Sequence, residues 1–150
     1  MMTLWFDMDG TIADLYAVDG WLDMLIAEDT FPYENAKPML NMNALAKRLN
    51  NLQKQGYQLG IISWCSKNGT NAYNDRVIAA KRKWLTQHLK SVQWDRIEIV
   101  PYGTPKHEVC AGGTLFDDEE RNRTAWQTSG AGLALEPSFI ITTLQYLKGC

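Results

Sequence analysis

Two aspartates at the end of an apolar run carry the first chemical signal in this chain. Residues 4–11 read Leu-Trp-Phe-Asp-Met-Asp-Gly-Thr, so Asp7 and Asp9 flank a single residue just before a Gly-Thr turn. Side chains alternate along a strand, so both carboxylates share one face. Carboxylates held this close favour a hard cation such as Mg²⁺, which also takes waters and phosphate oxygens as ligands. An Asp-Gly turn that only ends a strand is the simpler alternative.

A hydroxyl and an ammonium group follow later in the chain. Ser63 ends the apolar run 59–63, and its hydroxyl could donate a hydrogen bond to a phosphoryl oxygen or simply close a strand. Lys106 lies in a loop marked by Gly103 and Pro105, where a solvated surface charge is the ordinary interpretation. Its position just ahead of a second acidic pair favours a role in the same site.

That second acidic pair is Asp117 and Asp118, which end the short apolar run 114–116. Acidic residues are also favoured at the first turn of a helix, so capping could explain one or two of them. Capping does not explain why this strand ends in acids as the first one does. Four signals in this order therefore predict one site that handles phosphate and binds a metal through oxygen ligands.

Length and composition limit the class of protein. A chain of 150 residues is expected to form one domain with a substantial core. Cys65, Cys110 and Cys150 are odd in number and scattered, and we expect a reducing cytoplasm, no disulfide framework, no signal peptide and no membrane span. Neither histidine has a cysteine partner at zinc-ligand spacing, so a structural zinc site is not expected.

The formal net charge of −2 argues against stable binding of nucleic acid through bulk electrostatics. The run Lys81-Arg82-Lys83 is a local exception. It falls within a predicted helix over 72–89, so a solvated helix face is favoured over a patch that binds a nucleic-acid backbone.

The hydrophobic pattern predicts an α/β fold of the Rossmann-like type, a parallel sheet with helices on both faces. The expected strands are residues 3–8, 58–64, 97–100, 114–116 and 132–135, and the expected helices are residues 42–52, 72–89, 119–129 and 137–147. Ligands of such sheets bind outside the carboxyl ends of the strands, where the predicted site residues fall.

Residues 16–41 interrupt the alternation of strands and helices. We expect a core of residues 1–15 and 42–150 and a small helical cap of residues 16–41, with a short helix over 18–28. Trp21, Phe31 and Tyr33 could form an apolar lid or a wall that stacks on a base. The alternative is a small core that fixes the insert to the rest of the domain.

At this point the chain resembles the haloacid dehalogenase superfamily of phosphohydrolases. The segment 6–11 (Phe-Asp-Met-Asp-Gly-Thr), Ser63, Lys106 and the segment 115–118 (Leu-Phe-Asp-Asp) match its four motifs in order, and the resemblance spans residues 3 to about 135. Asp14 after Ala13, and Lys106 placed eleven residues before Asp117, look like the 5'(3')-deoxyribonucleotidase branch and its phage and bacterial relatives. The insert is shorter than the cap of that branch, and Ser63-Trp64 replaces its usual Thr-Ser pair.

The resemblance implies a Mg²⁺-dependent phosphatase that works through an aspartyl-phosphate. Asp7 would be the nucleophile and Asp9 the general acid and base. The implied Mg²⁺ ligands are Asp7, the main chain of Asp9 and Asp117, with Asp118 acting through a water. Ser63 and Lys106 would bind the phosphoryl group, and the main chain of Met8 would face its developing charge.

The expected substrate is a small phosphorylated molecule, with a nucleotide favoured, and the candidate residues for contact with the rest of that molecule are Trp21, Tyr33 and Trp64. A 3'-phosphatase of polynucleotide ends is an alternative that keeps the chemistry. A receiver-like regulatory module is a rival of another class. It is disfavoured because receivers place their paired acids first and their acceptor aspartate in mid-chain, with no late acidic pair.

Overall fold

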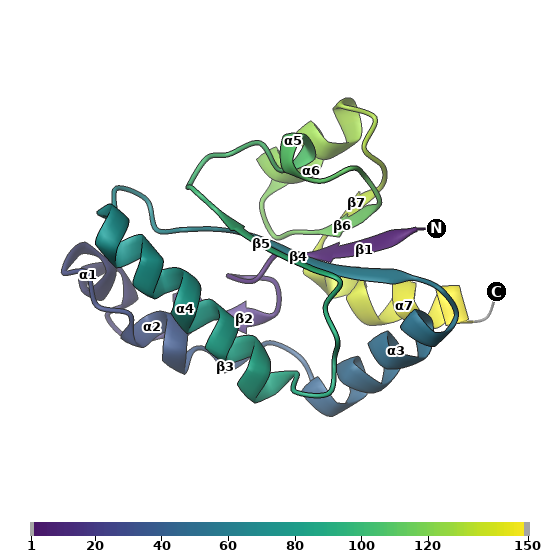
Figure 1. The fold of residues 1–150 in the computed structure, drawn as a ribbon, viewed down its shortest axis with the longest axis horizontal. Coiled ribbons are helices and arrows are strands. Elements are labelled where there is room, and N and C mark those ends of the chain that lie inside the picture. The colour runs from purple at the N-terminus through teal and green to yellow at the C-terminus, as the bar shows by residue number, and fades with distance from the viewer. Residues whose placement is uncertain (1, 149–150) are drawn as a thin grey trace.

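A five-stranded parallel sheet forms the centre of the molecule (Figure 1). The computed structural model describes residues 2–148, so Cys150 lies outside the described residues. The strand order is β5-β4-β1-β6-β7. The strands are β1 (Thr3–Phe6), β4 (Gln58–Trp64), β5 (Arg96–Val100), β6 (Thr114–Phe116) and β7 (Ala134–Leu135).

Helices cover both faces of this sheet, as the hydrophobic pattern predicts. On one face, α3 (Met42–Lys54), α4 (Asn71–His88) and α7 (Ile140–Lys148) enclose the larger core, which includes Phe6 and Ile61. On the other face, α5 (Lys106–Val109) and α6 (Glu120–Thr128) cover Trp5 and Ile62 (Figure 1). The predicted α/β class is therefore confirmed. The expected helix over 137–147 begins as a short 3-10 turn, η2 (Pro137–Phe139), that leads into α7.

Local sequence explains where α3, the helix that leads into β4, begins and ends. The Asn41 side chain caps α3 by accepting a hydrogen bond from the Ala44 amide, and Leu45, Leu49 and Leu52 bury one face of the helix. The chain then turns at Gly56, whose φ of 102° suits glycine. The helix thus ends in time for β4 to begin beside β1.

The insert after β1 is held by a two-stranded antiparallel ladder that the sequence does not predict. This ladder pairs β2 (Ala13–Asp14) with β3 (Lys37–Pro38). Between them lie the 3-10 turn η1 (Leu15–Ala17), α1 (Trp21–Ile26) and α2 (Phe31–Asn35), so the expected helix over 18–28 is shorter than predicted. The boundary between core and cap remains a prediction.

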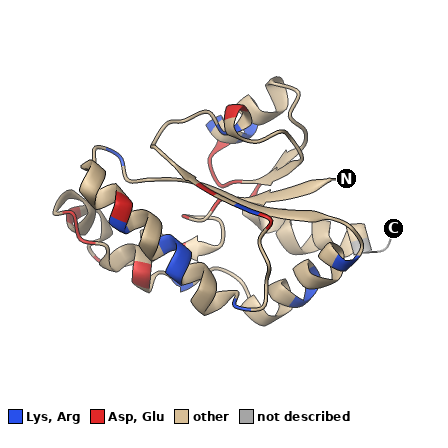
Figure 2. Cartoon of the chain, viewed as in Figure 1, with Lys and Arg blue, Asp and Glu red and all other residues tan. Residues whose placement is uncertain are grey.

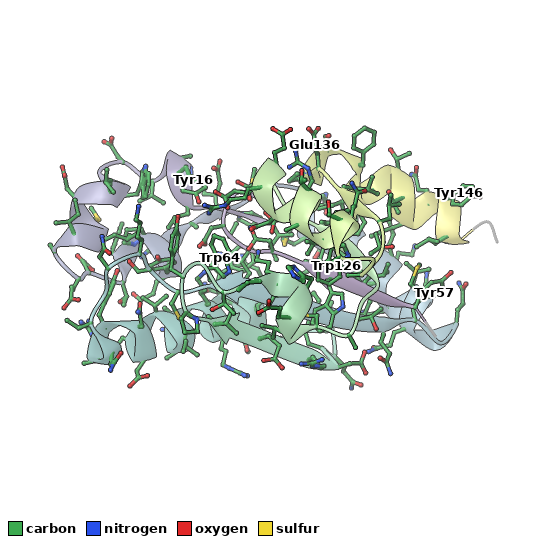
Figure 3. The ribbon with its side chains drawn as sticks, turned by 90° about the horizontal axis from the view of Figure 1, so that it is seen from above. Tyr16, Tyr57, Trp64, Trp126, Glu136 and Tyr146 are labelled. Atoms are coloured by element: carbon green, nitrogen blue, oxygen red, sulfur yellow. The ribbon has the colours of Figure 1, made fainter. Side chains whose placement is uncertain are left out.

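The strand order places a topological switch point at β1. This strand pairs with β4 on one side and with β6 on the other, so the chain segments that follow these three strands meet at one edge of the sheet. Figure 3 shows Tyr16 and Trp64 toward this end of the molecule, whereas Tyr57 and Tyr146 lie at the opposite end.

Two further expectations concern cysteines and membranes. Cys65 and Cys110 are both free and buried. Within residues 2–148 no helix has the length and apolar character needed to cross a bilayer.

Candidate functional site

Asp7 and Asp117 lie side by side because the ladder between β1 and β6 continues past both strands. The Asp7 amide continues this ladder by donating to the Phe116 carbonyl at 2.9 Å, and the Asp117 amide extends the neighbouring ladder of β6 and β7 by donating to the Leu135 carbonyl at 3.1 Å. Both aspartates are buried at the carboxyl edge of the sheet. The two acidic motifs, 110 residues apart in the sequence, therefore meet as predicted.

Asp118 completes an acidic cluster that could hold a metal ion. One carboxylate oxygen from each of Asp7, Asp117 and Asp118 lies within 4.8 Å of the other two. Three carboxylates at this separation offer the hard oxygen ligands that Mg²⁺ prefers, and buried like charges favour a divalent cation between them. The donor set therefore fits the expected metal.

The pKa of the Asp118 carboxyl is raised from its ordinary 3.8 to about 7. Burial is the largest cause, and the negative charge of Asp7 and a hydrogen bond between Asp118 and Asp7 add to it. Thr11 binds this residue twice, because its hydroxyl lies 3.3 Å from Asp118 Oδ1 and accepts from the Asp118 amide at 3.2 Å. Asp118 thus points directly into the cluster. The expectation that Asp118 contacts the metal through a water remains a prediction.

Gly10 makes this close approach sterically possible. Its φ of 77° lies in the left-handed region, and a Cβ there would collide with Asp118 Oδ2. The Met8 carbonyl accepts hydrogen bonds from the amides of Thr11, Ile12 and Ala13, which closes a tight turn after the first acidic pair. The Gly-Thr dipeptide therefore fits both the backbone geometry and the second acidic pair.

Lys106 lies at the first position of α5, and its ammonium group bridges two of the acids. Its Nζ lies 3.0 Å from Asp7 Oδ1 and 2.6 Å from Asp117 Oδ2. Burial alone would lower the pKa of Lys106, but the charges of Asp7 and Asp117 outweigh burial and raise it, so the side chain carries a positive charge. Asn122 adds a hydrogen bond of 3.2 Å to the same Asp117 oxygen.

The main residue that the sequence analysis missed is Lys81. It was expected on a solvated helix face together with Arg82 and Lys83, and this expectation is wrong for Lys81, which is 1% exposed. The neighbours Arg82 and Lys83 are exposed as expected. Lys81 follows Val77 by four residues and precedes Trp84 by three, so its helical spacing on the buried face could have identified it.

Ser63 contacts Lys81 rather than the open part of the site. Its side chain is fully buried, and its Oγ accepts a hydrogen bond from Lys81 Nζ at 2.8 Å. Ser66, three residues further along, lines the cavity beside the acids instead. The structure therefore does not place the Ser63 hydroxyl on the cavity wall, where direct contact with a phosphoryl group was expected. The cause is the alternation of β4, which turns Trp64 to the cavity and Ser63 toward α4.

A cavity of about 610 Å³ opens beside the acidic cluster. Asp7, Asp9 and Lys106 lie at its charged part. Its apolar wall comes from the insert and from the ends of β4 and β5, and includes Trp21, Leu22, Leu25, Ile26, Tyr33, Trp64 and Tyr102. A phosphate at the acids would therefore leave the rest of its molecule in a space with this apolar wall on one side and polar residues such as Lys67 and Asn68 on another.

The aromatic residues expected to contact substrate have different surroundings. Trp21 lines the cavity, and its ring lies edge-on to Tyr16 at 5.0 Å. Tyr33 also reaches the cavity but is buried in a small core with Tyr73 and Val77, as the alternative of a pinned insert describes. Trp64 is fixed by a 2.8 Å hydrogen bond to the Thr104 carbonyl.

The Met8 side chain is buried in the main core, so only its main chain could contact a ligand.

The charged side chains of the site face one another. Asp7, Asp9, Asp117 and Asp118 face the ammonium groups of Lys81 and Lys106, an arrangement that leaves a negative balance suited to a divalent cation. Blue and red segments both occur along α4 in Figure 2, so this helix does not present a uniformly basic face.

Comparisons with known proteins support the fold. The structure is similar to a D,D-heptose 1,7-bisphosphate phosphatase from Burkholderia thailandensis, with a TM-score of 0.53 and 14% identity over 89% of this chain and 75% of that one. It is also similar to the D,D-heptose 1,7-bisphosphate phosphatase from B. bronchiseptica complexed with magnesium and phosphate, with a TM-score of 0.53 and 15% identity over 89% of this chain and 78% of that one. No protein-family model matches the sequence, and no curated protein matches it either.

Proposed function

We propose that the chain is a Mg²⁺-dependent phosphomonoester hydrolase that acts through an aspartyl-phosphate on Asp7. The observation that carries this proposal is the meeting of Asp7, Asp117 and Asp118 within 4.8 Å, with Lys106 bridging two of them. The shared fold with two phosphatases, one crystallised with magnesium and phosphate, supports the same reaction class.

Charge explains why these residues are needed together. A carboxylate facing a phosphate dianion at ~4 Å is opposed by about 8 kcal/mol at an effective dielectric near 20. When held by Asp7, Asp117 and the main chain of Asp9, with Asp118 acting through a water, Mg²⁺ would supply positive charge that offsets this repulsion. Lys106 adds a further positive charge beside the nucleophile.

The proposed reaction has two steps at Asp7. In the first, an Asp7 carboxylate oxygen forms a bond to phosphorus while the ester P–O bond breaks, and Asp9 gives its proton to the departing oxygen. In the second, a water attacks the phosphorus, Asp9 takes the proton of that water, and the bond to Asp7 breaks to release phosphate. Both aspartates line the cavity where the substrate would bind.

The apolar wall favours a nucleotide as the substrate. Trp21, Trp64 and Tyr102 offer aromatic surface in the cavity on which a flat base could lie. The polynucleotide 3'-phosphatase alternative loses part of its support, because Lys81 is buried and only Arg82 and Lys83 of the basic run remain exposed to guide a strand. A sugar bisphosphate, the substrate that the names of the two similar phosphatases give, would be the competing substrate, because Lys67 also lines the cavity beside Tyr102 and could face a second phosphate.

A panel of phosphate esters tests the proposal. We expect phosphate release from nucleoside monophosphates with Mg²⁺, no release with a chelator, and little dependence on added salt. Release that is fastest from a 3'-phosphorylated oligonucleotide and falls steeply with salt would favour the polynucleotide alternative. Preference for sugar bisphosphates would contradict the nucleotide assignment but keep the phosphatase.

A further inference from the structure

Lys81 is a second buried lysine in the site, and it does not contact the metal cluster. Its Nζ lies 2.8 Å from Asp9 Oδ2, 2.8 Å from Ser63 Oγ and 2.7 Å from the Trp64 carbonyl oxygen. An ammonium group has three N–H donors, so these three oxygens satisfy all of them. The side chain therefore has one defined position, with its charge paired to Asp9.

These contacts join two separate segments of the site. Asp9 comes from the turn after β1, whereas Ser63 and Trp64 form the carboxyl end of β4. Lys81 reaches both from α4, and its Nζ lies 5.1 Å from the ring centre of Tyr33 in the insert. An element that is remote from Asp9 in sequence thus fixes the Asp9 side chain.

We infer that Lys81 is a positioning residue that orients Asp9 for proton transfer, an inference that rests on the proposed phosphatase function. Lys81 holds Asp9 Oδ2, which leaves the other carboxylate oxygen for the cavity that Asp9 lines. General acid catalysis requires the donor within hydrogen-bond distance of the leaving oxygen, so a freely rotating Asp9 would be less effective. Ser63 contributes by accepting from the same ammonium group, which explains why its hydroxyl is buried.

The competing interpretation is that Lys81 and Asp9 form an ion pair that only stabilises the fold. Substrates with different leaving groups distinguish the two interpretations. An alkyl phosphate needs its departing oxygen protonated, whereas an activated aryl phosphate departs without much help. Loss of positioning should therefore slow the alkyl ester selectively, whereas a general weakening of the fold should slow both esters alike.

The experiment compares kcat for an alkyl and an activated aryl phosphate in Lys81→Met, with Lys83→Met as the matched control on the exposed side of the same helix. We expect Lys81→Met to lose about 10- to 100-fold on the alkyl ester and less than about threefold on the aryl ester. Lys83→Met should keep both rates. In an Asp9→Asn background, Lys81→Met should change the alkyl rate by less than about twofold, because the group that it positions is already gone.

Thermal unfolding of each variant identifies any that fail to fold. If Lys81→Met does not fold, Lys81→Gln, which keeps a polar donor, carries the same comparison. Equal losses of kcat on both esters would overturn the positioning role of Lys81 and leave the proposed phosphatase function standing. A full additional loss of kcat in the Asp9→Asn background would do the same. A folded wild-type protein that hydrolyses neither ester would overturn the proposed function together with this inference.

Discussion

At the scale of single residues, the site consists of acids that burial and neighbouring lysines keep in fixed positions. Lys106 bridges Asp7 and Asp117, and Lys81 holds Asp9. Removing one partner from a buried ion pair costs roughly 3–5 kcal/mol, because the remaining charge loses its compensation. The lysines therefore contribute to the geometry of the site as well as to its charge.

Titration of Asp118 predicts how metal binding depends on pH. The pKa of Asp118 is about 7 in the folded protein and 3.8 ordinarily. Between pH 3.8 and pH 7, Asp118 therefore holds a proton in the folded state that it has lost in the unfolded state. The metal-free protein should therefore lose stability as pH rises from about 4 to 7, and level off above. Mg²⁺ needs the ionised carboxylate, so its apparent affinity should fall up to about tenfold per pH unit below 7.

Thermal unfolding with and without Mg²⁺ at pH 6 and pH 8 checks this prediction. The rise in Tm caused by Mg²⁺ should be larger at pH 8, and Asp118→Asn should flatten the difference between the two pH values. An equal rise at both pH values in the wild-type protein would show that Asp118 does not control metal binding.

At the scale of elements, the insert provides a wall of the cavity. Trp21 begins α1 and faces the cavity, whereas Phe31, at the start of α2, is exposed and does not line it. The two aromatic residues thus differ in their access to a bound substrate. This difference supplies a matched pair of variants.

We expect Trp21→Ala to raise the KM for a nucleoside monophosphate by roughly 5- to 30-fold, the range expected for a lost stacking contact of ~1–2 kcal/mol. The kcat for a small phosphate ester should change little, because the acids remain in place. Phe31→Ala should alter neither value. Steady-state kinetics check these expectations, and equal effects of both variants would argue against stacking on Trp21.

The predictable elements are those with strong local patterns. The apolar runs that become β1, β4 and β6 fix where Asp7 and Asp117 must lie, because parallel strands bring their carboxyl ends together. The ladder of β2 and β3 was not predicted, because its strands have two residues each and, unlike β7, do not lie in an apolar run that continues the alternation of strands and helices. The prediction places Lys81 in solvent because a charged residue on a helix is usually exposed; its spacing from Val77 and Trp84 indicates burial, and its tertiary partners show what it binds.

At the scale of the whole molecule, the site depends on the strand order. The segments after β1 and β6 and the start of α5 meet because β1 lies at the switch point of the sheet, with α4 closing the site from one face. Ser63 shows the limit of motif reasoning, because its place in the sequence fits the motif while its side chain faces Lys81.

Chemical trapping of the phosphorylated residue tests whether Asp7 is the nucleophile. The Asp9→Asn variant is mixed with an activated aryl phosphate and Mg²⁺, quenched, reduced with borohydride and analysed by peptide mass spectrometry. An aspartyl-phosphate is reduced to homoserine, and we expect this change at Asp7, dependent on substrate and Mg²⁺ and absent from the Asp7→Asn variant. Conversion at another carboxylate, or none at Asp7 while the aryl ester is hydrolysed, would contradict it.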